Sequence, residues 1–285
     1  MRYHFSRFAG LMIASLAGSY ALAQSDVCNQ RTVVGTYALS VQGTTLIMLP
    51  GVAQPFAAPF ASLSIASIDS AGTISGHGYG AFNGQVAPAP FNGTIQVNPD
   101  CTAISKPSAG IAATDVILEG GDEFKGLLTH FPMGNPVLQG RAKRISRALD
   151  ATRSAHCSAA KVHGTYAVTY QGDYLVPPPG GPLLFPVPAL MIGLASIDRQ
   201  GQVSGRGTAS LAGQATEFEI VSGNIDVQSD CTATVQMSVK SGNLVDEGKI
   251  WMVILEGGDE LWAIQTESHV AKPVLAGIWK RVSEW

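Results

Sequence analysis

The segment Val116-Ile117-Leu118-Glu119-Gly120-Gly121-Asp122-Glu123 recurs unchanged at residues 253–260. Four other segments recur in the same order. They are Gly-Thr-Tyr-Ala at 35–38 and 164–167, Ala-Ser-Ile-Asp at 66–69 and 195–198, Asp-Cys-Thr-Ala at 100–103 and 230–233, and Pro-Val-Leu at 136–138 and 273–275. Matches that keep their order indicate an internal duplication. We therefore expect two homologous units at residues 28–146 and 157–283, joined by a linker at residues 147–156.

Each unit has the pattern of short, evenly spaced strands. The second unit predicts strands near residues 163–172, 188–198, 202–211, 216–227, 231–240, 249–256, 260–268 and 274–283. Turn residues such as Asp198 and Gly201, or Gly257 and Gly258, separate them, and we find no convincing helical period of apolar residues. Eight sequential strands with hairpin links can close and remove both sheet edges. The predicted fold is all-β: two tandem antiparallel eight-stranded up-and-down barrels, with β-sandwiches as the alternative.

The four cysteines fit the duplication. Cys28 and Cys101 occupy the same places in the first unit as Cys157 and Cys231 occupy in the second. Four cysteines allow three pairings. The symmetry of the duplication selects Cys28–Cys101 and Cys157–Cys231, and disulfides of this kind form in oxidising compartments.

The first residues predict export. Residues 1–23 combine a basic start (Arg2, Arg7), an apolar stretch at 8–22 and the small-residue end Ala21-Leu22-Ala23, as in a secretory signal peptide. A membrane anchor is the alternative, but its apolar run is interrupted and shorter than the roughly 20 residues that a span needs. We expect a periplasmic or extracellular protein.

Charge and hydropathy exclude several partners. The formal net charge is −3 and only 14% of residues are charged, without a basic cluster, so we expect no nucleic-acid partner. A sixteen-stranded outer-membrane barrel would need an apolar outward face. The last strand instead carries Trp279, Arg281 and Ser283 on one face. We therefore expect a protein that is not integral to a membrane.

The pattern resembles the calycin or lipocalin family in both units. The resemblance rests on the opening Gly-x-Tyr (Gly35 and Tyr37, Gly164 and Tyr166), the long first loop, and a last strand that ends in basic residues (Lys143 and Arg144, Lys280 and Arg281). Lipocalins have tryptophan at the tyrosine position and a second motif that this chain lacks. The resemblance implies cation–π contacts of Arg144 with Tyr37 and of Arg281 with Tyr166 at the closed end of each barrel.

The long first loops are the candidate ligand lids. They are apolar and rich in proline, and long loops are uncommon unless they are functional. Lid and cavity residues are predicted to be Tyr37, Phe56, Phe60, Tyr79, Tyr166, Leu183 and Phe185. Alternatively, the two loops pack on each other between the units, or they form a surface for self-association.

Catalytic residues stay unknown at this stage, and whether the chain is an enzyme stays open. The sequence has no nucleophile elbow, zinc-protease motif or dinucleotide fingerprint. If a reaction occurs, the candidate groups are Glu119, Glu256, Tyr37, Tyr79 and His77. The acidic turns that begin at Glu119 and Glu256 could bind Ca²⁺, but the EF-hand spacing is absent, so we expect no metal and no cofactor.

The sequence thus favours an exported protein that binds a small apolar molecule within two homologous barrels. Two alternatives stay open. The first is a cofactor-free isomerase or cyclase that acts on an apolar substrate in a barrel cavity. The second is a structural or adhesive secreted protein that associates through its Pro-rich apolar loops.

Overall fold

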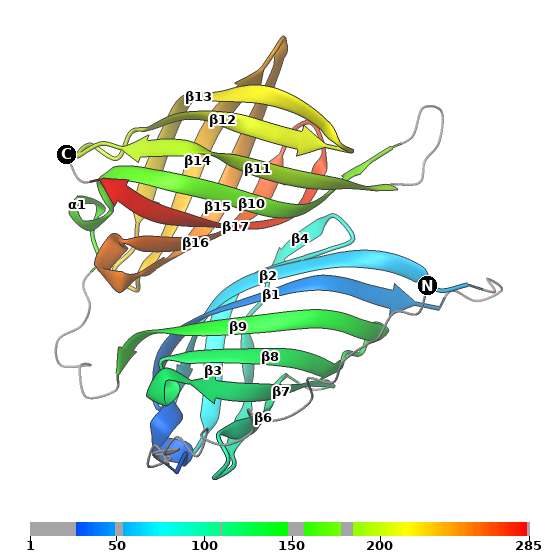
Figure 1. Cartoon of the computed structure of the whole chain (residues 1–285), viewed down its shortest axis with the longest axis vertical. Helices are drawn as coiled ribbons and strands as arrows, with labels where there is room; N and C mark the ends of the chain where they lie inside the picture. Colours follow the sequence, from blue (N-terminus) through cyan, green and yellow to red (C-terminus); the bar gives the residue numbers. More distant parts are fainter. Residues whose placement is uncertain (1–26, 49–53, 109, 148–156, 178–184, 284–285) are drawn as a thin grey trace, which may run out of the picture.

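A computed structural model of the chain describes residues 27–48, 54–108, 110–147, 157–177 and 185–283. The predicted signal peptide, most of the predicted linker and Leu183 lie outside the described residues. The described part forms two antiparallel β-barrels in tandem, each with its own apolar core (Figure 1). The predicted fold class is therefore confirmed, and the sandwich alternative is wrong.

The first barrel, barrel 1, contains residues 35–147. Its strands are β1 (Gly35–Ile47), β2 (Phe56–Ile68), β3 (Thr73–Phe82), β4 (Gln85–Pro88), β5 (Phe91–Val97), β6 (Thr102–Ser108), β7 (Ile111–Leu118), β8 (Glu123–His130) and β9 (Asn135–Arg147). The sheet runs in the order β2-β1-β9-β8-β7-β6-β5-β3-β4, and β2 also pairs with β3. This additional pairing closes the barrel.

The fourth strand of barrel 1 is interrupted. β4 pairs with residues 79–82 of β3, whereas β5 pairs with residues 73–76 of the same strand. Pro88 and Pro90 stand at the interruption, and a proline cannot donate a hydrogen bond to a sheet ladder. β4 consequently leaves the barrel wall and reaches toward the other barrel (Figure 1). Among the described residues, β4 pairs with β3 only.

Barrel 2 contains residues 164–283 and is regular. Its strands are β10 (Gly164–Val176), β11 (Phe185–Ile197), β12 (Val203–Leu211), β13 (Gln214–Val227), β14 (Thr232–Ser241), β15 (Leu244–Leu255), β16 (Glu260–Ser268) and β17 (Lys272–Ser283). They close in sequential order. The single long strand β13 occupies the place that β4 and β5 share in barrel 1.

A short helical segment covers one end of each barrel. In barrel 1 it is the 3₁₀ helix η1 (Gln30–Val33), and in barrel 2 it is α1 (Ala159–Val162). Each segment places a fully buried valine, Val33 or Val162, into the barrel end. We call this end the closed end.

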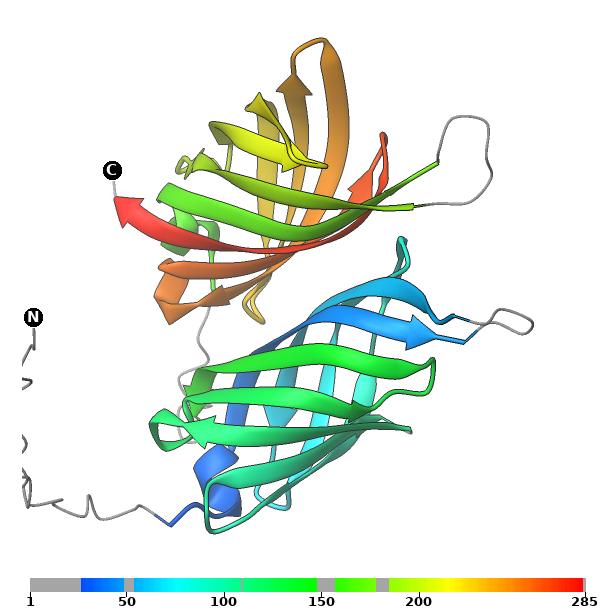
Figure 2. The ribbon, with the colours of Figure 1, turned by 45° about the vertical axis from the view of Figure 1, so that its right-hand side comes forward.

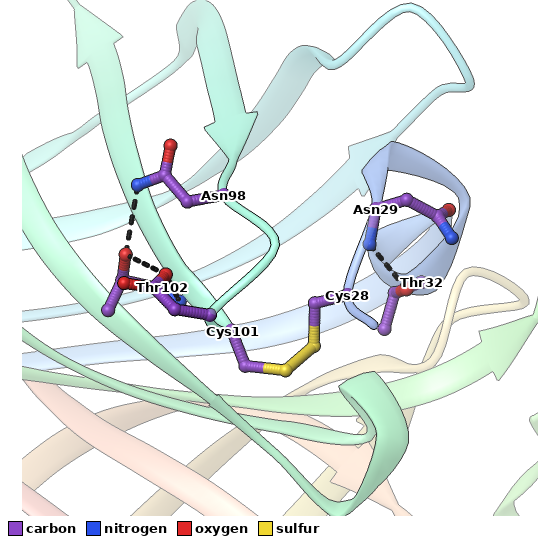
Figure 3. Close-up of a disulfide and its surroundings, with 7 residues drawn as sticks. Cys28, Asn29, Thr32, Asn98, Cys101 and Thr102 are labelled. Carbon is purple, nitrogen blue, oxygen red and sulfur yellow. Dashed lines mark hydrogen bonds between the residues drawn. A yellow bond between two sulfur atoms is a disulfide. The ribbon is translucent and has the colours of Figure 1, made fainter. Parts of the chain in front are cut away.

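Disulfides fix these closed ends. Cys28, next to η1, bonds to Cys101 in the turn before β6 (Figure 3). Cys157, next to α1, bonds to Cys231 in the equivalent turn before β14. The pairing predicted from the duplication is confirmed. Two disulfides indicate that the chain folds in an oxidising compartment.

The arginine of the last strand lies against the tyrosine of the first strand at each closed end. The Arg144 guanidinium carbon is 5.3 Å from the centre of the Tyr37 ring, and that of Arg281 is 5.6 Å from the centre of the Tyr166 ring. The Tyr37 hydroxyl donates to the Gly121 carbonyl at 2.9 Å. Burial raises the pKa of Tyr37 to about 12, so this hydroxyl keeps its proton. These contacts hold the closed end together.

The two barrels pack side by side through their walls (Figure 2). Because strand residues alternate between the two faces, each wall presents a second set of side chains outside the barrel. The buried residues of this contact are Ala38, Ala61, Leu63 and Ala81 from barrel 1 and Leu175, Trp251, Val253, Leu255, Trp262, Ile264, Val274 and Ala276 from barrel 2. The described contact between the barrels therefore comes from strands rather than from packed first loops.

Candidate functional site

Barrel 1 contains an interior cavity of about 120 Å³. It lies between η1 at the closed end and the opposite, open end of the barrel. Its lining is mostly apolar and includes Leu39, Val41, Ile74, Phe91, Ile95, Phe124, Leu128 and Ala142, together with the polar residues Ser105 and Asp115. Small-molecule sites in proteins commonly have this composition, an apolar wall with a few polar groups.

The cavity exists because small residues in barrel 1 replace large ones in barrel 2. Ala142 pairs with Leu39 in barrel 1, and at the equivalent place in barrel 2 Trp279 pairs with Val168. Trp279 is almost fully buried in the core of barrel 2. An indole ring therefore fills the part of barrel 2 that Ala142 leaves open in barrel 1.

A second replacement enlarges the same space. Val41 pairs with Gly140, and at the equivalent place Tyr170 pairs with Gly277. The Tyr170 hydroxyl accepts a hydrogen bond from the Trp279 indole nitrogen at 3.0 Å, so the two large side chains of barrel 2 also satisfy each other's polar atoms. Val41 and Ala142 supply no such filling.

Asp115 is the acidic group of the cavity. It lies on β7, opposite Gly126 of β8, and its Oδ2 accepts a hydrogen bond from the Ser105 hydroxyl at 2.7 Å. Gly126 matters here because a Cβ at that position would collide with the Asp115 carboxylate. Burial raises the pKa of Asp115, although the Ser105 hydrogen bond opposes this rise. The position in barrel 2 that corresponds to Asp115 is Met252, which is fully buried.

Asp115 was not among the residues predicted to form a site, although two signals in the sequence point to it. In β7 the inward positions are Ala113, Asp115 and Ile117, so the strand places an acidic residue on the face that otherwise carries core residues. In the alignment of the two units, Asp115 also corresponds to Met252. A change from an apolar to an acidic residue at an inward position distinguishes the two barrels.

Three phenylalanines cluster near the open end of barrel 1. Phe60 of β2 lies next to Phe82 of β3, with ring centres 6.5 Å apart, and Phe131 contacts both rings at 5.4 and 6.4 Å. Phe60 was predicted to belong to a lid. It instead belongs to a regular strand, and its ring packs in this cluster rather than on the cavity wall.

The other predicted ligand residues lie apart from the cavity. Tyr37 and Tyr166 lie at the two closed ends. Tyr79 lies on the outer wall of barrel 1, with its ring centre 5.6 Å from that of Trp251 in barrel 2. Phe56 and Phe185 begin β2 and β11, and Phe185 is exposed. None of the predicted residues of barrel 1 lines the cavity, so their role in binding stays a prediction.

Of the five groups nominated for catalysis, Tyr37 is buried at the closed end of barrel 1 and Tyr79 lies on its outer wall. The other three lie outside the barrels. His77 is exposed, and its Nε2 is 3.5 Å from the Asp230 carboxylate of barrel 2. Glu119 and Glu256 begin the 3₁₀ turns η2 (Glu119–Gly121) and η4 (Glu256–Gly258). Within the described ranges, no group of three or more metal-binding side chains could hold a metal ion.

The fold and the cavity together define the class: an all-β protein of two tandem closed eight-stranded barrels, one of which is hollow. No family model matches the chain, and no curated protein matches it significantly. A porin-like protein from Bacteroides uniformis ATCC 8492 aligns with 86% of this chain and 96% of its own, at 9% identity and a TM-score of 0.21. A structural similarity this low supports no conclusion about fold or function. In the described part of the chain, no helix is long and apolar enough to cross a membrane.

Proposed function

We propose that the chain is an exported binding protein whose first barrel holds a small apolar molecule that carries one polar group. The second barrel is its support. This proposal rests on one observation. Barrel 1 has a cavity at the positions where Trp279 and Tyr170 fill barrel 2. The predicted signal peptide and the two disulfides support export to the periplasm or the cell exterior.

The size of the cavity limits the ligand. An engineered apolar cavity of about 150 Å³ in another protein takes up benzene or xenon. A cavity of about 120 Å³ therefore fits a molecule near the size of one six-membered ring. Phe91, Phe124 and Leu128 would contact its apolar surface.

Asp115 determines which polar group the ligand should carry. A protonated carboxyl both donates and accepts a hydrogen bond, whereas a carboxylate only accepts. In either state it can accept from a ligand hydroxyl, and Ser105 already satisfies one of its oxygens. We therefore expect phenol to bind more tightly than benzene or toluene.

The test is binding of phenol and toluene to the purified mature protein, measured by calorimetry and by the shift of the melting temperature. A ligand that binds only the folded state raises this temperature. Ala142→Trp, which introduces the residue of barrel 2, should abolish both the heat of binding and the shift. Ala57→Trp, at an exposed position of β2, is the matched control and should bind as the wild type does. Absence of binding to the wild type would refute the proposal.

Asp115 also favours a second candidate function, proton transfer on a small carbonyl compound. An interior carboxylate with a raised pKa is a stronger base than an ordinary one, and it could remove a proton from the carbon next to a carbonyl. Solvent would then return a proton to that carbon. Incubation with cyclohexanone in D₂O, followed by NMR, should show deuterium incorporation that Asp115→Asn abolishes. Equal rates for both proteins would exclude this candidate.

A further inference from the structure

The contact between the barrels uses two different faces. We call the outer side of the first three strands of a barrel its first-strand face, and the outer side of the last three its last-strand face. Within the chain, the last-strand face of barrel 2 packs on the first-strand face of barrel 1. Leu63 on the wall of barrel 1 and Ile264 on the wall of barrel 2 are 1% and 0% exposed.

Because of the duplication, each barrel has both kinds of face. The first-strand face of barrel 2 and the last-strand face of barrel 1 are not covered by the contact within the chain. On the first-strand face of barrel 2, Leu190 and Ile192 stand where Ala61 and Leu63 stand in barrel 1, and they are 55% and 61% exposed. On the last-strand face of barrel 1, Leu127 and Val137 stand where Ile264 and Val274 stand in barrel 2. They are 63% and 66% exposed. Apolar residues thus occupy the same positions whether or not the face is covered.

The charges that cross the contact are also duplicated. Lys143 of barrel 1 lies between two carboxylates of barrel 2, with its Nζ 2.5 Å from Glu256 and 2.9 Å from Glu260. The equivalent lysine is Lys280, which is exposed, and the equivalent carboxylates are Glu119, which is also exposed, and Glu123, which already pairs with Arg141 at 3.0 Å. Lys280 of β17 borders the first-strand face of barrel 2 and Glu119 borders the last-strand face of barrel 1, so the edges of the two uncovered faces carry opposite charges.

Both uncovered faces lie on one side of the molecule. They border a groove of about 750 Å³ between the barrels, with Val116 and Leu127 on one wall and Leu190 on the other. In Figure 1, β7, β8 and β9 lie on the same side as β11 and β12. One partner molecule can therefore cover both faces at once.

We propose that this partner is a second copy of the chain. The last-strand face of barrel 1 in each copy packs on the first-strand face of barrel 2 in the other, which repeats between copies the contact already made within one copy. Because both faces lie on one side of each copy, the two contacts form together and close a two-fold dimer. Lys280 of one copy then meets Glu119 of the other.

The contact between copies is weaker than the contact within the chain. The positions of Trp251 and Trp262, which anchor the contact within the chain, correspond to Thr114 and Lys125 in barrel 1. Buried tryptophans commonly supply most of the binding energy of an interface. We therefore expect a reversible dimer whose population depends on concentration.

The test is sedimentation equilibrium of the mature protein over a wide concentration range. The wild type should pass from one to two copies. Leu127→Glu and Ile192→Lys, one on each face, should each weaken dimerisation at least tenfold, because every homodimer of either variant contains two defective contacts. Leu244→Glu changes an equally exposed leucine away from both faces and is the control, with wild-type association expected.

An equimolar mixture of Leu127→Glu and Ile192→Lys separates this arrangement from other dimers. The mixed dimer has one unaltered contact and one in which glutamate faces lysine, so the mixture should associate more tightly than either variant alone. A chain that stays monomeric, assemblies larger than the dimer, or variants that associate as the wild type does would overturn the proposal. So would a mixture no tighter than its components. Circular dichroism of each variant checks that it is folded.

Discussion

Barrel 1 and barrel 2 share their strand register, their covered closed end and the position of their disulfide. They differ in what fills them. Trp279, Tyr170 and Met252 pack the interior of barrel 2, and Ala142, Val41 and Asp115 leave space at the same positions of barrel 1. The comparison teaches that an unchanged wall can enclose either a solid core or a binding cavity, because the inward side chains alone decide which one forms.

The walls differ as well. Barrel 1 has a broken fourth strand, and its β4 packs against barrel 2. β13 is instead a single strand that pairs with β12 and with β14, with a register shift between Ile220 and Ser222. Phe91, the first residue of β5 after the break, lines the cavity. The hollow barrel is thus also the one whose wall is interrupted next to the cavity.

The largest expected effect on stability comes from removing the indole ring that fills barrel 2. Trp279→Ala should lower the free energy of unfolding by about 3–5 kcal/mol, because it removes a buried ring and leaves a cavity. It also leaves the Tyr170 hydroxyl without its indole partner. Chemical denaturation measures the loss, and xenon binding detected by NMR should report a new cavity in barrel 2. A loss below about 1 kcal/mol would mean that barrel 2 is not a packed core.

The two disulfides are a feature that the barrels share, so the loss of either one should lower the stability of the protein by a similar amount. The bridges span 73 and 74 residues. Loops of this length predict a loss of about 2–4 kcal/mol for each bridge. We expect the double variants Cys28→Ser with Cys101→Ser, and Cys157→Ser with Cys231→Ser, to differ from each other by less than about 1 kcal/mol in denaturant unfolding. A larger difference would show that the barrels depend unequally on their closed ends.

The smallest expected effect concerns Asp115. Because burial raises its pKa in the folded state, the folded protein binds this proton more tightly than the unfolded chain does. The free energy of unfolding therefore falls as the pH rises from the ordinary pKa of aspartate to the raised pKa of Asp115. Above the raised pKa, the loss caused by Asp115 is constant. Asp115→Asn should remove this dependence and gain on the order of 1 kcal/mol at neutral pH.

The measurement is the difference in unfolding free energy between wild type and Asp115→Asn from pH 3 to pH 8. The difference should grow in favour of the variant as pH rises and then level off. Asp226→Asn, which removes the carboxylate of an exposed aspartate on β13, is the matched control for the substitution itself. A difference that is flat with pH would contradict a raised pKa for Asp115.

Much of this architecture could be predicted from the sequence alone. Repetition of short segments such as residues 116–123 predicted two units, and the spacing of the turns predicted eight strands in each. The break that divides the fourth strand of barrel 1 into β4 and β5 was not predicted. The positions of Cys28, Cys101, Cys157 and Cys231 within the duplicated units determined the disulfides. These features are local or repeated, so the chain displays them without any knowledge of distant contacts.

The cavity and the contact between the barrels were decided by the tertiary structure. A strand of alternating residues shows that it has two faces, but only closure of the sheet determines which face becomes interior. Trp251 and Trp262 look like core residues and lie outside barrel 2, where barrel 1 covers them. Asp115 looks like a surface residue and faces the interior of barrel 1, because its register on β7 points it inward opposite Gly126.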